Sequence, residues 1–222
     1  MNEWMPERWK GRSRLALWHS MLFKDHCLVR WVLPNAHRVT DELWRCGQPL
    51  PFNFAGWRRR GIRTVINLRG AVKFASWVLA REAAERQGLV FVNYGLRSRD
   101  LPTRDELLGL LDLLDSAAYP VLLHCKSGSD RTGLVAGIYL IHRLGRSPAE
   151  AQRQLTLRYL HMRNGKAGVL RLVLTSYARA VAERPIAFRA WVETAYDPAP
   201  LAASWGEWTW RSAVMERLLR RE

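Results

Sequence analysis

A cysteine and an arginine six positions apart, near the middle of the chain, could together transfer a phosphoryl group. Cys125 and Arg131 bracket a short loop with Gly128 at its centre. A thiolate is a strong nucleophile, and the planar guanidinium of an arginine pairs with two oxygens of a phosphoryl group at once. The glycine lets the backbone approach those oxygens closely. The spacing therefore predicts covalent catalysis, in which a phosphocysteine on Cys125 divides one difficult step into two.

The residues on either side of this loop predict how the site is held. The apolar run 120–123 is typical of a buried strand, and 134–141 is typical of a helix packed against it. A strand, a tight loop and a helix N-terminus form an anion site from backbone N–H groups, which also stabilise a thiolate at its mouth. Thr132 could donate a hydrogen bond to the sulfur, and we expect His124 to orient the loop through a backbone hydrogen bond. The expected substrate-binding positions are Lys126, Ser127, Gly128, Ser129 and Thr132.

The complete loop pattern, His124-Cys125-x-x-Gly128-x-x-Arg131-Thr132-Gly133, resembles the signature loop of the cysteine-dependent protein tyrosine and dual-specificity phosphatases. Its Arg-Thr-Gly ending favours the dual-specificity branch over rhodanese-type and arsenate-reductase-type loops. Upstream, residues 43–49 resemble the segment that opens the domain in bacterial and plant-type dual-specificity phosphatases. The resemblance implies a phosphatase fold and the hydrolysis of a phosphomonoester.

The general acid has two candidates. The leaving oxygen needs a proton and a water must later be activated, and one carboxyl group can do both. Asp130, beside Arg131, resembles the acid of bacterial and lipid-directed members whose loop reads Asp-Arg-Thr. Asp100 lies in a segment upstream of Cys125, at about the distance at which many dual-specificity phosphatases carry their acid. Both stay open, and Asp130 is favoured.

The rest of the chain alternates between strand and helix patterns. We expect a strand within 61–69, a helix over 73–87 that stops at Gly88, a strand over 89–93, and helices that begin at Thr103 and Ser147. This alternation predicts an α/β fold with a mostly parallel central sheet flanked by helices. The nucleophile loop then lies at the carboxyl end of a strand, where open α/β sheets bind ligands. We expect Arg45 and Arg69 to support a loop or to lie at the surface rather than to bind phosphate.

Composition and charge suggest three parts of the chain. The 222 residues contain 35 Lys and Arg against 20 Asp and Glu, a net charge of +15, which favours anionic partners. We predict a basic, Trp-rich N-terminal extension over 1–40, the phosphatase domain over 41–182, and a C-terminal extension over 183–222 packed on that domain. Leu15, Trp18 and Leu22 share a helical face. That face suits either an interfacial helix on anionic lipid or a packed extension with a solvated basic side.

Three substrate classes fit a phosphatase of this kind. A phosphorylated protein is the first, and a phospholipid, phosphoinositide or inositol phosphate is the alternative. Lys126 resembles a lysine in lipid-directed loops, whereas Ser129 stands where those loops often carry a second lysine. An RNA 5′-phosphatase would suit the charge, but the chain lacks an aromatic and basic pattern of a recognisable RNA-binding module, so nucleic acid is not expected. A phosphate-binding module without activity is disfavoured because Cys125 and Arg131 are both intact.

The cysteines bear on compartment and cofactors. Cys27, Cys46 and Cys125 are odd in number and lack metal-ligand spacing, which favours a reducing compartment. The chemistry requires no cofactor and no metal, and we predict neither. The apolar run 15–23 is too short to span a bilayer. We therefore expect a cytoplasmic protein, with peripheral binding at the inner face of the membrane left open and the oligomeric state undetermined.

Overall fold

The computed structural model describes residues 4–71, 74–162 and 166–205. Within them, five strands form one sheet in the order β1-β2-β5-β3-β4. The strands are β1 (His37–Arg38), β2 (Leu43–Cys46), β3 (Thr64–Asn67), β4 (Val90–Asn93) and β5 (Val121–His124). Strands β2, β5, β3 and β4 pair in parallel, and β1 is antiparallel to β2 at one edge. The predicted α/β fold with a mostly parallel sheet is confirmed.

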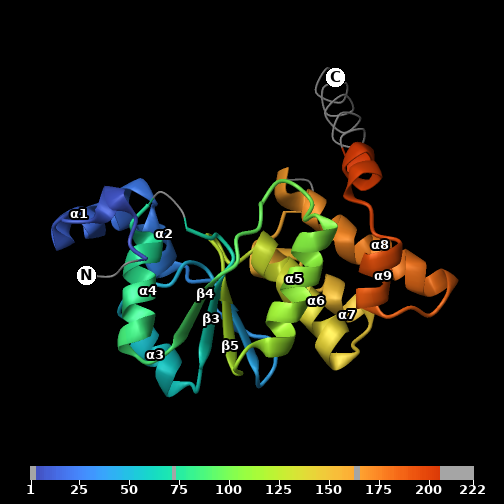
Figure 1. The fold of residues 1–222 in the computed structure, drawn as a ribbon, viewed down its shortest axis with the longest axis horizontal. Helices are drawn as coiled ribbons and strands as arrows, with labels where there is room; N and C mark the ends of the chain where they lie inside the picture. Colours follow the sequence, from blue (N-terminus) through green and yellow to red (C-terminus); the bar gives the residue numbers. More distant parts are fainter. Residues whose placement is uncertain (1–3, 72–73, 163–165, 206–222) are drawn as a thin grey trace, which may run out of the picture.

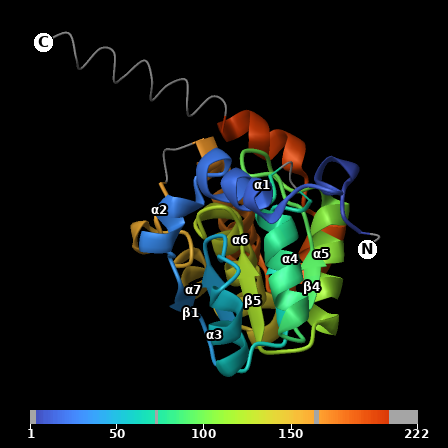
Figure 2. The ribbon, with the colours of Figure 1, turned by 90° about the vertical axis from the view of Figure 1, so that its left-hand side faces the viewer.

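Helices cover both faces of this sheet. They are α1 (Arg14–His19), α2 (Cys27–Val32), α3 (Asn53–Arg59), α4 (Ser76–Arg86), α5 (Arg104–Ser116), α6 (Asp130–Leu144), α7 (Pro148–Gln152), α8 (Arg171–Glu183) and α9 (Phe188–Thr194). Helices α3 and α4 lie on one side of the strands with α1 and α2 above them, and α5 to α9 lie on the other side (Figure 1). Figure 2, in which the first side faces the viewer, again places α1 and α2 at one end of the molecule.

Alternation along the strands divides the core between the two faces. Val65 of β3 and its partner Leu122 of β5 belong to the cluster under α3 and α4. The next pair, Ile66 and Leu123, belongs to the larger cluster under α5 and α6. All four side chains are fully buried, as expected for central parallel strands covered on both faces. This packing fixes β5 in the middle of the sheet and so fixes the loop that follows it.

Helix boundaries follow from local capping. The Thr103 side chain accepts from the Glu106 N–H while the Glu106 carboxylate accepts from the Thr103 N–H, and Ser147 and Glu150 repeat this arrangement. The helix expected over 73–87 begins at Ser76, and its end is followed by Gly88 with φ of +66°. Residue 73, where that helix was expected to begin, lies outside the described part of the chain.

The N-terminal segment packs on α4, and Trp18 and Leu22 of the predicted face are partly buried there. Leu17 and Met21 are buried against Leu79, whereas Leu15 is 80% exposed. The helix changes to a π turn at Ser20–Lys24, which rotates the following residues relative to a regular α-helix. The described part of this segment therefore packs on α4.

The C-terminal segment also contributes to the core. Phe188, Trp191 and Tyr196 are buried in the same cluster as Leu123. Residues 206–222 of the expected C-terminal extension lie outside the described part of the chain. The expected domain boundaries at residues 40 and 182 stay predictions. Among the residues that the structure describes, no helix has the length and apolar character needed to cross a membrane.

Candidate active site

The loop between β5 and α6 places Cys125 at the carboxyl end of the central strand. β5 ends at His124, and α6 begins at Asp130 with Ser129 as its N-cap. Cys125 is 2% exposed, and the N–H groups of Gly128 and Thr132 hydrogen-bond its sulfur. The expected arrangement of strand, tight loop and helix N-terminus is present, and we call residues 125–131 the phosphate loop.

Glycine is required at position 128 for two reasons. Its φ is +72°, which disfavours a residue with a Cβ. A Cβ there would also lie 2.5 Å from both the Cys46 carbonyl carbon and the Gly47 nitrogen. The segment after β2 thus lies directly against the phosphate loop, and the Gln48 N–H donates to the Lys126 carbonyl at 3.0 Å. Two adjacent strands therefore fix the shape of the loop.

The electrostatics of the phosphate loop favour a thiolate at Cys125. Burial raises the pKa of the thiol, but the positive charge of Arg131 and hydrogen bonds from Thr132 and Gly128 outweigh burial, so the net pKa is lowered. The buried Thr132 hydroxyl has no oxygen or nitrogen partner among the described residues, which leaves it for the sulfur. In contrast, burial raises the pKa of Cys46. Of these two cysteines, Cys125 is the one whose pKa is lowered.

Arg131 is held at the mouth of the loop by backbone carbonyls of neighbouring strands. Its Nη1 donates to the carbonyl oxygens of Leu68 and Leu96, each at 3.2 Å. These residues follow β3 and β4, so the carboxyl ends of both strands orient the guanidinium. His124 is fully buried, its pKa is lowered by burial to about 3, and its Nδ1 lies 3.4 Å from the Cys125 carbonyl oxygen. His124 is therefore neutral and contacts the loop backbone, as the sequence suggested.

Arg45 is buried beneath the phosphate loop. Its Nη2 donates to the carbonyl oxygens of Gly128 and Ser129 at 2.8 and 3.0 Å, and its Nη1 donates to both oxygens of Gln154. The guanidinium carbon also lies 4.0 Å from the centre of the Tyr159 ring. Burial lowers the pKa of Arg45 to about 10, so it remains a cation at neutral pH. We expected Arg45 either to support a loop or to lie at the surface, and in the structure it supports the phosphate loop.

Arg69 contacts a buried carboxylate that the sequence did not reveal as part of the site. Asp25 of the N-terminal segment is fully buried, and its two oxygens accept from Arg69 at 2.7 and 2.8 Å. Asp25 also accepts from Ser76 at 2.7 Å and lies 3.3 Å from Arg30. Burial raises the pKa of Asp25. The contacts with Arg69, Ser76 and Arg30 lower it by more than burial raises it, so the net pKa is lowered.

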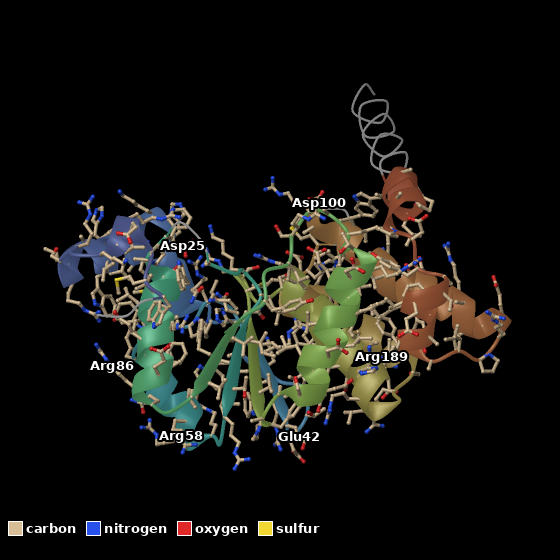
Figure 3. All side chains as sticks on the ribbon, in the orientation of Figure 1. Asp25, Glu42, Arg58, Arg86, Asp100 and Arg189 are labelled. Atoms are coloured by element: carbon tan, nitrogen blue, oxygen red, sulfur yellow. The ribbon has the colours of Figure 1, made fainter. Side chains whose placement is uncertain are left out.

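This carboxylate also reaches the phosphate loop. The Lys126 Nζ lies 3.6 Å from Asp25 Oδ1, and the lysine side chain is 45% exposed. Figure 3 shows Asp25 on the N-terminal segment, close to the end of the sheet that carries the loop. The N-terminal segment therefore contributes to the surroundings of Lys126.

The two candidate acids lie in different surroundings. Asp130 is 24% exposed and its Oδ1 lies 2.7 Å from Nδ1 of His161, which is fully buried. Asp100 is 61% exposed, pairs only loosely with Arg97 at 3.9 Å, and lies at the tip of the loop between β4 and α5 (Figure 3). The structure brings Asp130 to the phosphate loop and leaves Asp100 in the solvent.

A cleft of about 610 Å³ opens over these residues. Its lining includes Lys126, Ser127, Asp130 and Arg131 of the phosphate loop. Two further arginines, Arg30 and Arg99, and three apolar residues, Leu33, Leu160 and Met162, complete most of the remaining wall. The described part of the chain contains no cluster of three or more His, Cys, Asp or Glu side chains that could hold a metal ion.

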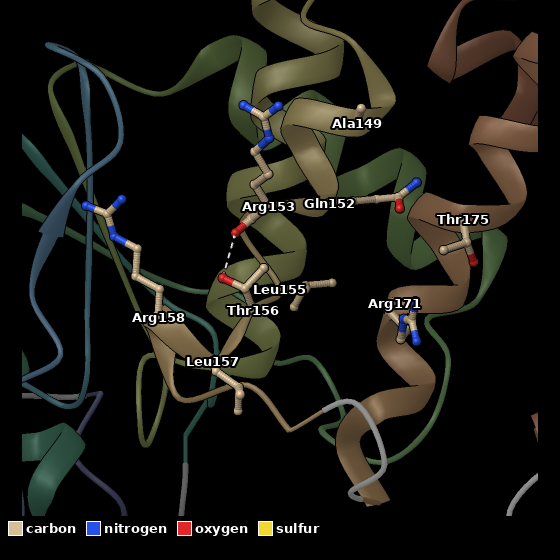
Figure 4. Close-up of a pocket in the computed structure, with 9 residues that line it drawn as sticks. All are labelled: Ala149, Gln152, Arg153, Leu155, Thr156, Leu157, Arg158, Arg171 and Thr175. Atoms are coloured by element: carbon tan, nitrogen blue, oxygen red, sulfur yellow. Dashed lines mark hydrogen bonds between the residues drawn. The ribbon is translucent and has the colours of Figure 1, made fainter.

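A second hollow, of about 560 Å³, lies beside α7 and α8. Arg153, Arg158 and Arg171 line it, but Figure 4 shows the guanidinium groups of Arg153 and Arg158 at separate places, not turned toward a shared point. The Thr156 hydroxyl donates to the Arg153 carbonyl at 3.1 Å and so serves the local turn. These side chains do not converge on one point, and we assign no ligand to this hollow.

Sequence reasoning missed Asp25, His161 and Gln154. Each contacts the site from a segment at least 20 residues away in the chain. None belongs to a local motif, so the one signal for Asp25 is that no other Asp or Glu occurs between positions 8 and 40 of the basic N-terminal segment.

Comparison with known proteins places most of the described chain in one family. A family model described as a DSP-PTPase phosphatase fused to NAD+ kinase matches residues 34–168. The inositol diphosphatase DSP4 of Arabidopsis thaliana is 32% identical over 108 residues, covering 46% of this chain and 53% of DSP4. DSP3 of the same plant, also an inositol diphosphatase, is 30% identical over 114 residues, covering 46% and 52%. The chain thus spans about half the length of these relatives.

Solved structures share the fold at lower identity. TpbA of P. aeruginosa superposes with a TM-score of 0.53 and 22% identity, over 68% of this chain and 92% of TpbA, and TpbA has also been solved in complex with pTyr. PTPMT1 in complex with PI(5)P superposes with a TM-score of 0.50 and 18% identity, over 66% and 98%. These likenesses show a common fold.

Proposed function

The chain belongs to the DSP-PTPase family of cysteine-dependent phosphatases, as its signature loop predicted, and we propose that it hydrolyses phosphomonoesters through a phosphocysteine on Cys125. The observation that carries this proposal is the placing of the almost fully buried Cys125 sulfur at the N-terminus of α6, where the N–H groups of Gly128 and Thr132 and the charge of Arg131 surround it and lower its pKa. Burial alone would keep the thiol protonated, so the phosphate loop and Arg131 together compensate for a large desolvation penalty. The same positive groups suit a bound phosphoryl group.

The reaction proceeds in two balanced steps. The Cys125 thiolate attacks phosphorus, an S–P bond forms, and the bond from phosphorus to the ester oxygen breaks while a carboxyl group gives that oxygen a proton. A water molecule then loses a proton to the same carboxylate and attacks phosphorus, the S–P bond breaks, and the thiolate and inorganic phosphate are released. Arg131 and the N–H groups of the loop bind the phosphoryl oxygens through both steps.

Asp130 is the better placed of the two candidate acids. It lines the cleft beside Arg131, whereas Asp100 is exposed at a loop tip. Nδ1 of His161 contacts Asp130 at 2.7 Å, and the other ring nitrogen of His161 is buried without a partner among the described residues. This contact from a fully buried ring holds the Asp130 carboxyl group in a fixed orientation at the cleft.

The nucleophile is tested with Cys125→Ser. Turnover of para-nitrophenyl phosphate should be abolished, and binding of tungstate, measured by calorimetry, should be largely retained because the backbone cradle and Arg131 remain. Turnover at the wild-type rate in Cys125→Ser would contradict the proposal.

The acid is tested by comparing Asp130→Asn with its matched control Asp100→Asn. With a poor leaving group such as an alkyl phosphate, Asp130→Asn should lose the basic limb of its pH–rate profile, and its rate should become strongly dependent on leaving-group pKa. Asp100→Asn should retain the wild-type profile. The reverse result would move the acid to the loop between β4 and α5.

The charge of the cleft favours a substrate with more than one anionic group. Arg30, Arg99, Lys126 and Arg131 line it, whereas a phosphotyrosine carries a single phosphate. Inositol phosphates and phosphoinositides fit this charge, and the relatives DSP3 and DSP4 are inositol diphosphatases. A phosphorylated protein is the second candidate, since TpbA, which shares the fold, was solved with pTyr. Comparing kcat/KM for an inositol phosphate and a phosphotyrosyl peptide distinguishes the two.

A further inference from the structure

Apolar side chains surround the mouth of the cleft and face the solvent. Leu33, Leu160 and Met162 line the cleft, yet they are 61%, 56% and 66% exposed. Leu33 follows α2, whereas the other two belong to the segment after Leu157–Tyr159. Two separate parts of the chain thus place apolar groups at the same opening. Such placement is costly in water unless another surface covers it.

Helix α2 extends this apolar rim. It exposes apolar side chains to the solvent and turns its charged side chain inward, which is the reverse of the usual arrangement. Leu28, Trp31 and Val32 are 40%, 60% and 80% exposed. Its one charged side chain, Arg30, instead turns inward and contacts Asp25. A helix at the surface of a globular protein normally buries its apolar residues and exposes its charges.

The rim continues beyond α2 and lies at one end of the molecule. Phe52 is 53% exposed and its ring lies 5.8 Å from that of Trp31. Figures 1 and 2 both place α2 at the end where the loop between β4 and α5 also lies. Trp31 and Phe52 are of the type that enters the boundary between lipid headgroups and acyl chains.

The charge inside this rim is almost entirely positive. Arg30, Arg99, Lys126 and Arg131 line the cleft, and Asp130 is the one carboxylate among its described lining residues. An apolar rim around a cationic centre complements an anionic bilayer, in which headgroup phosphates lie just above an apolar interior. The apolar surface of a protein partner would not in itself supply phosphate groups to the cleft.

We propose that α2, Leu33, Phe52, Leu160 and Met162 dock this protein on an anionic lipid bilayer, with the cleft facing a phosphorylated lipid headgroup. The docking surface is defined by exposed side chains and does not depend on catalysis. Its role in presenting a lipid substrate rests on the proposed phosphatase function. Docking would bring Cys125 to a phosphate that stays within the plane of the membrane.

The test uses the full chain and a double variant, Trp31→Ser with Val32→Ser. These residues lie outside the cleft lining, so turnover of para-nitrophenyl phosphate should be unchanged. The matched control is Val90→Ser with Leu144→Ser, which removes exposed apolar groups at the start of β4 and the end of α6. Flotation is measured with vesicles of equal parts phosphatidylserine and phosphatidylcholine, and with phosphatidylcholine alone. Turnover is measured on a phosphatidylinositol monophosphate placed in the anionic vesicles.

Wild type and control should bind the anionic vesicles, and the Trp31/Val32 variant should bind about tenfold or more weakly, with a matching loss of turnover only on the vesicles. Equal binding by the variant and wild type would overturn the docking surface. Absence of wild-type binding to anionic vesicles would also overturn it. A variant that sediments differently from wild type but still binds vesicles would overturn it as well, because this result would indicate that the surface joins two copies of the chain. If wild type turned over no phosphomonoester, soluble or in vesicles, the proposed function would fail, whereas vesicle binding would still test the surface.

Discussion

Replacement of Asp25 by asparagine should destabilise the fold far more than replacement of an exposed aspartate with the same contact distance. Asp25 is fully buried and lies 2.7 Å from Arg69, whose side chain is 4% exposed. Asp112 lies at the same distance from Arg189, but these side chains are 70% and 34% exposed. Removing one partner of a buried pair leaves the other charge uncompensated and costs about 3–5 kcal/mol. An exposed pair contributes about 0–1 kcal/mol.

The assay is urea unfolding of wild type, Asp25→Asn and Asp112→Asn, followed by tryptophan fluorescence under reducing conditions. Since a domain is stable by about 5–15 kcal/mol, Asp25→Asn should lose a large fraction of its free energy of unfolding. Asp112→Asn should lose about 1 kcal/mol or less. Equal losses in the two variants would show that burial does not govern the strength of the Asp25 contact.

The lowered pKa of Asp25 also predicts how the loss of stability in Asp25→Asn changes with pH. The folded pKa of Asp25 is lowered from the ordinary value of 3.8, so its contribution to stability is fully present above about pH 4. The contribution is lost as the pH falls through the folded pKa. The difference in free energy of unfolding between wild type and Asp25→Asn should therefore be constant near neutral pH and shrink below about pH 4. A difference that grows as the pH falls would refute the assigned network.

Three other predictions concern the phosphate loop. Gly128→Ala should lower kcat/KM about a hundredfold, because its Cβ would lie 2.5 Å from backbone atoms that follow β2. Gly88→Ala, with a similar φ of +66° but open space around it, should keep full turnover, and equal losses would exclude the steric cause. Arg45→Met should lower the free energy of unfolding by about 1–3 kcal/mol, because it leaves buried carbonyls of the loop without a donor, and unchanged urea unfolding would contradict this. Iodoacetamide should modify Cys125 with an apparent pKa below the ordinary thiol value of 9.0, and Arg131→Met should raise that pKa. Peptide mass spectrometry should find the other two cysteines, whose pKa is raised by burial, unmodified at neutral pH, and their equal modification would argue against selective activation.

The local elements of this fold could be predicted because their causes are local. The N-terminus of the helix that follows Thr103 is capped by hydrogen bonds between Thr103 and Glu106, which lie three positions apart. The strand before Cys125 is indicated by its apolar run. A helix stop such as Gly88 needs only a positive φ that glycine adopts readily. The alternation of these elements was sufficient for a mostly parallel sheet with helices on both faces.

The choice between alternatives needed the tertiary structure. Arg45 has the same local sequence whether it lies at the surface or beneath a loop, and only the approach of Gly128 and Gln154 decides between them. The sequence left two aspartates open as the acid and favoured Asp130 only slightly over Asp100. Our proposal of Asp130 rests on the cleft that it lines and on His161, which contacts it from a separate segment.

The sequence by itself determined which groups lie at the centre of the site, since Cys125, Gly128 and Arg131 fall within residues 125–131 and the short loop between β5 and α6 brings them together. The tertiary structure alone decided what surrounds that centre. Asp25 reaches Lys126, and exposed Trp31 lies near the rim of the cleft, because the N-terminal segment packs on α4 beside the loop. Contacts between residues far apart in the chain depend on the total free energy of many weak packing interactions across the whole fold. No local pattern of residues contains that total.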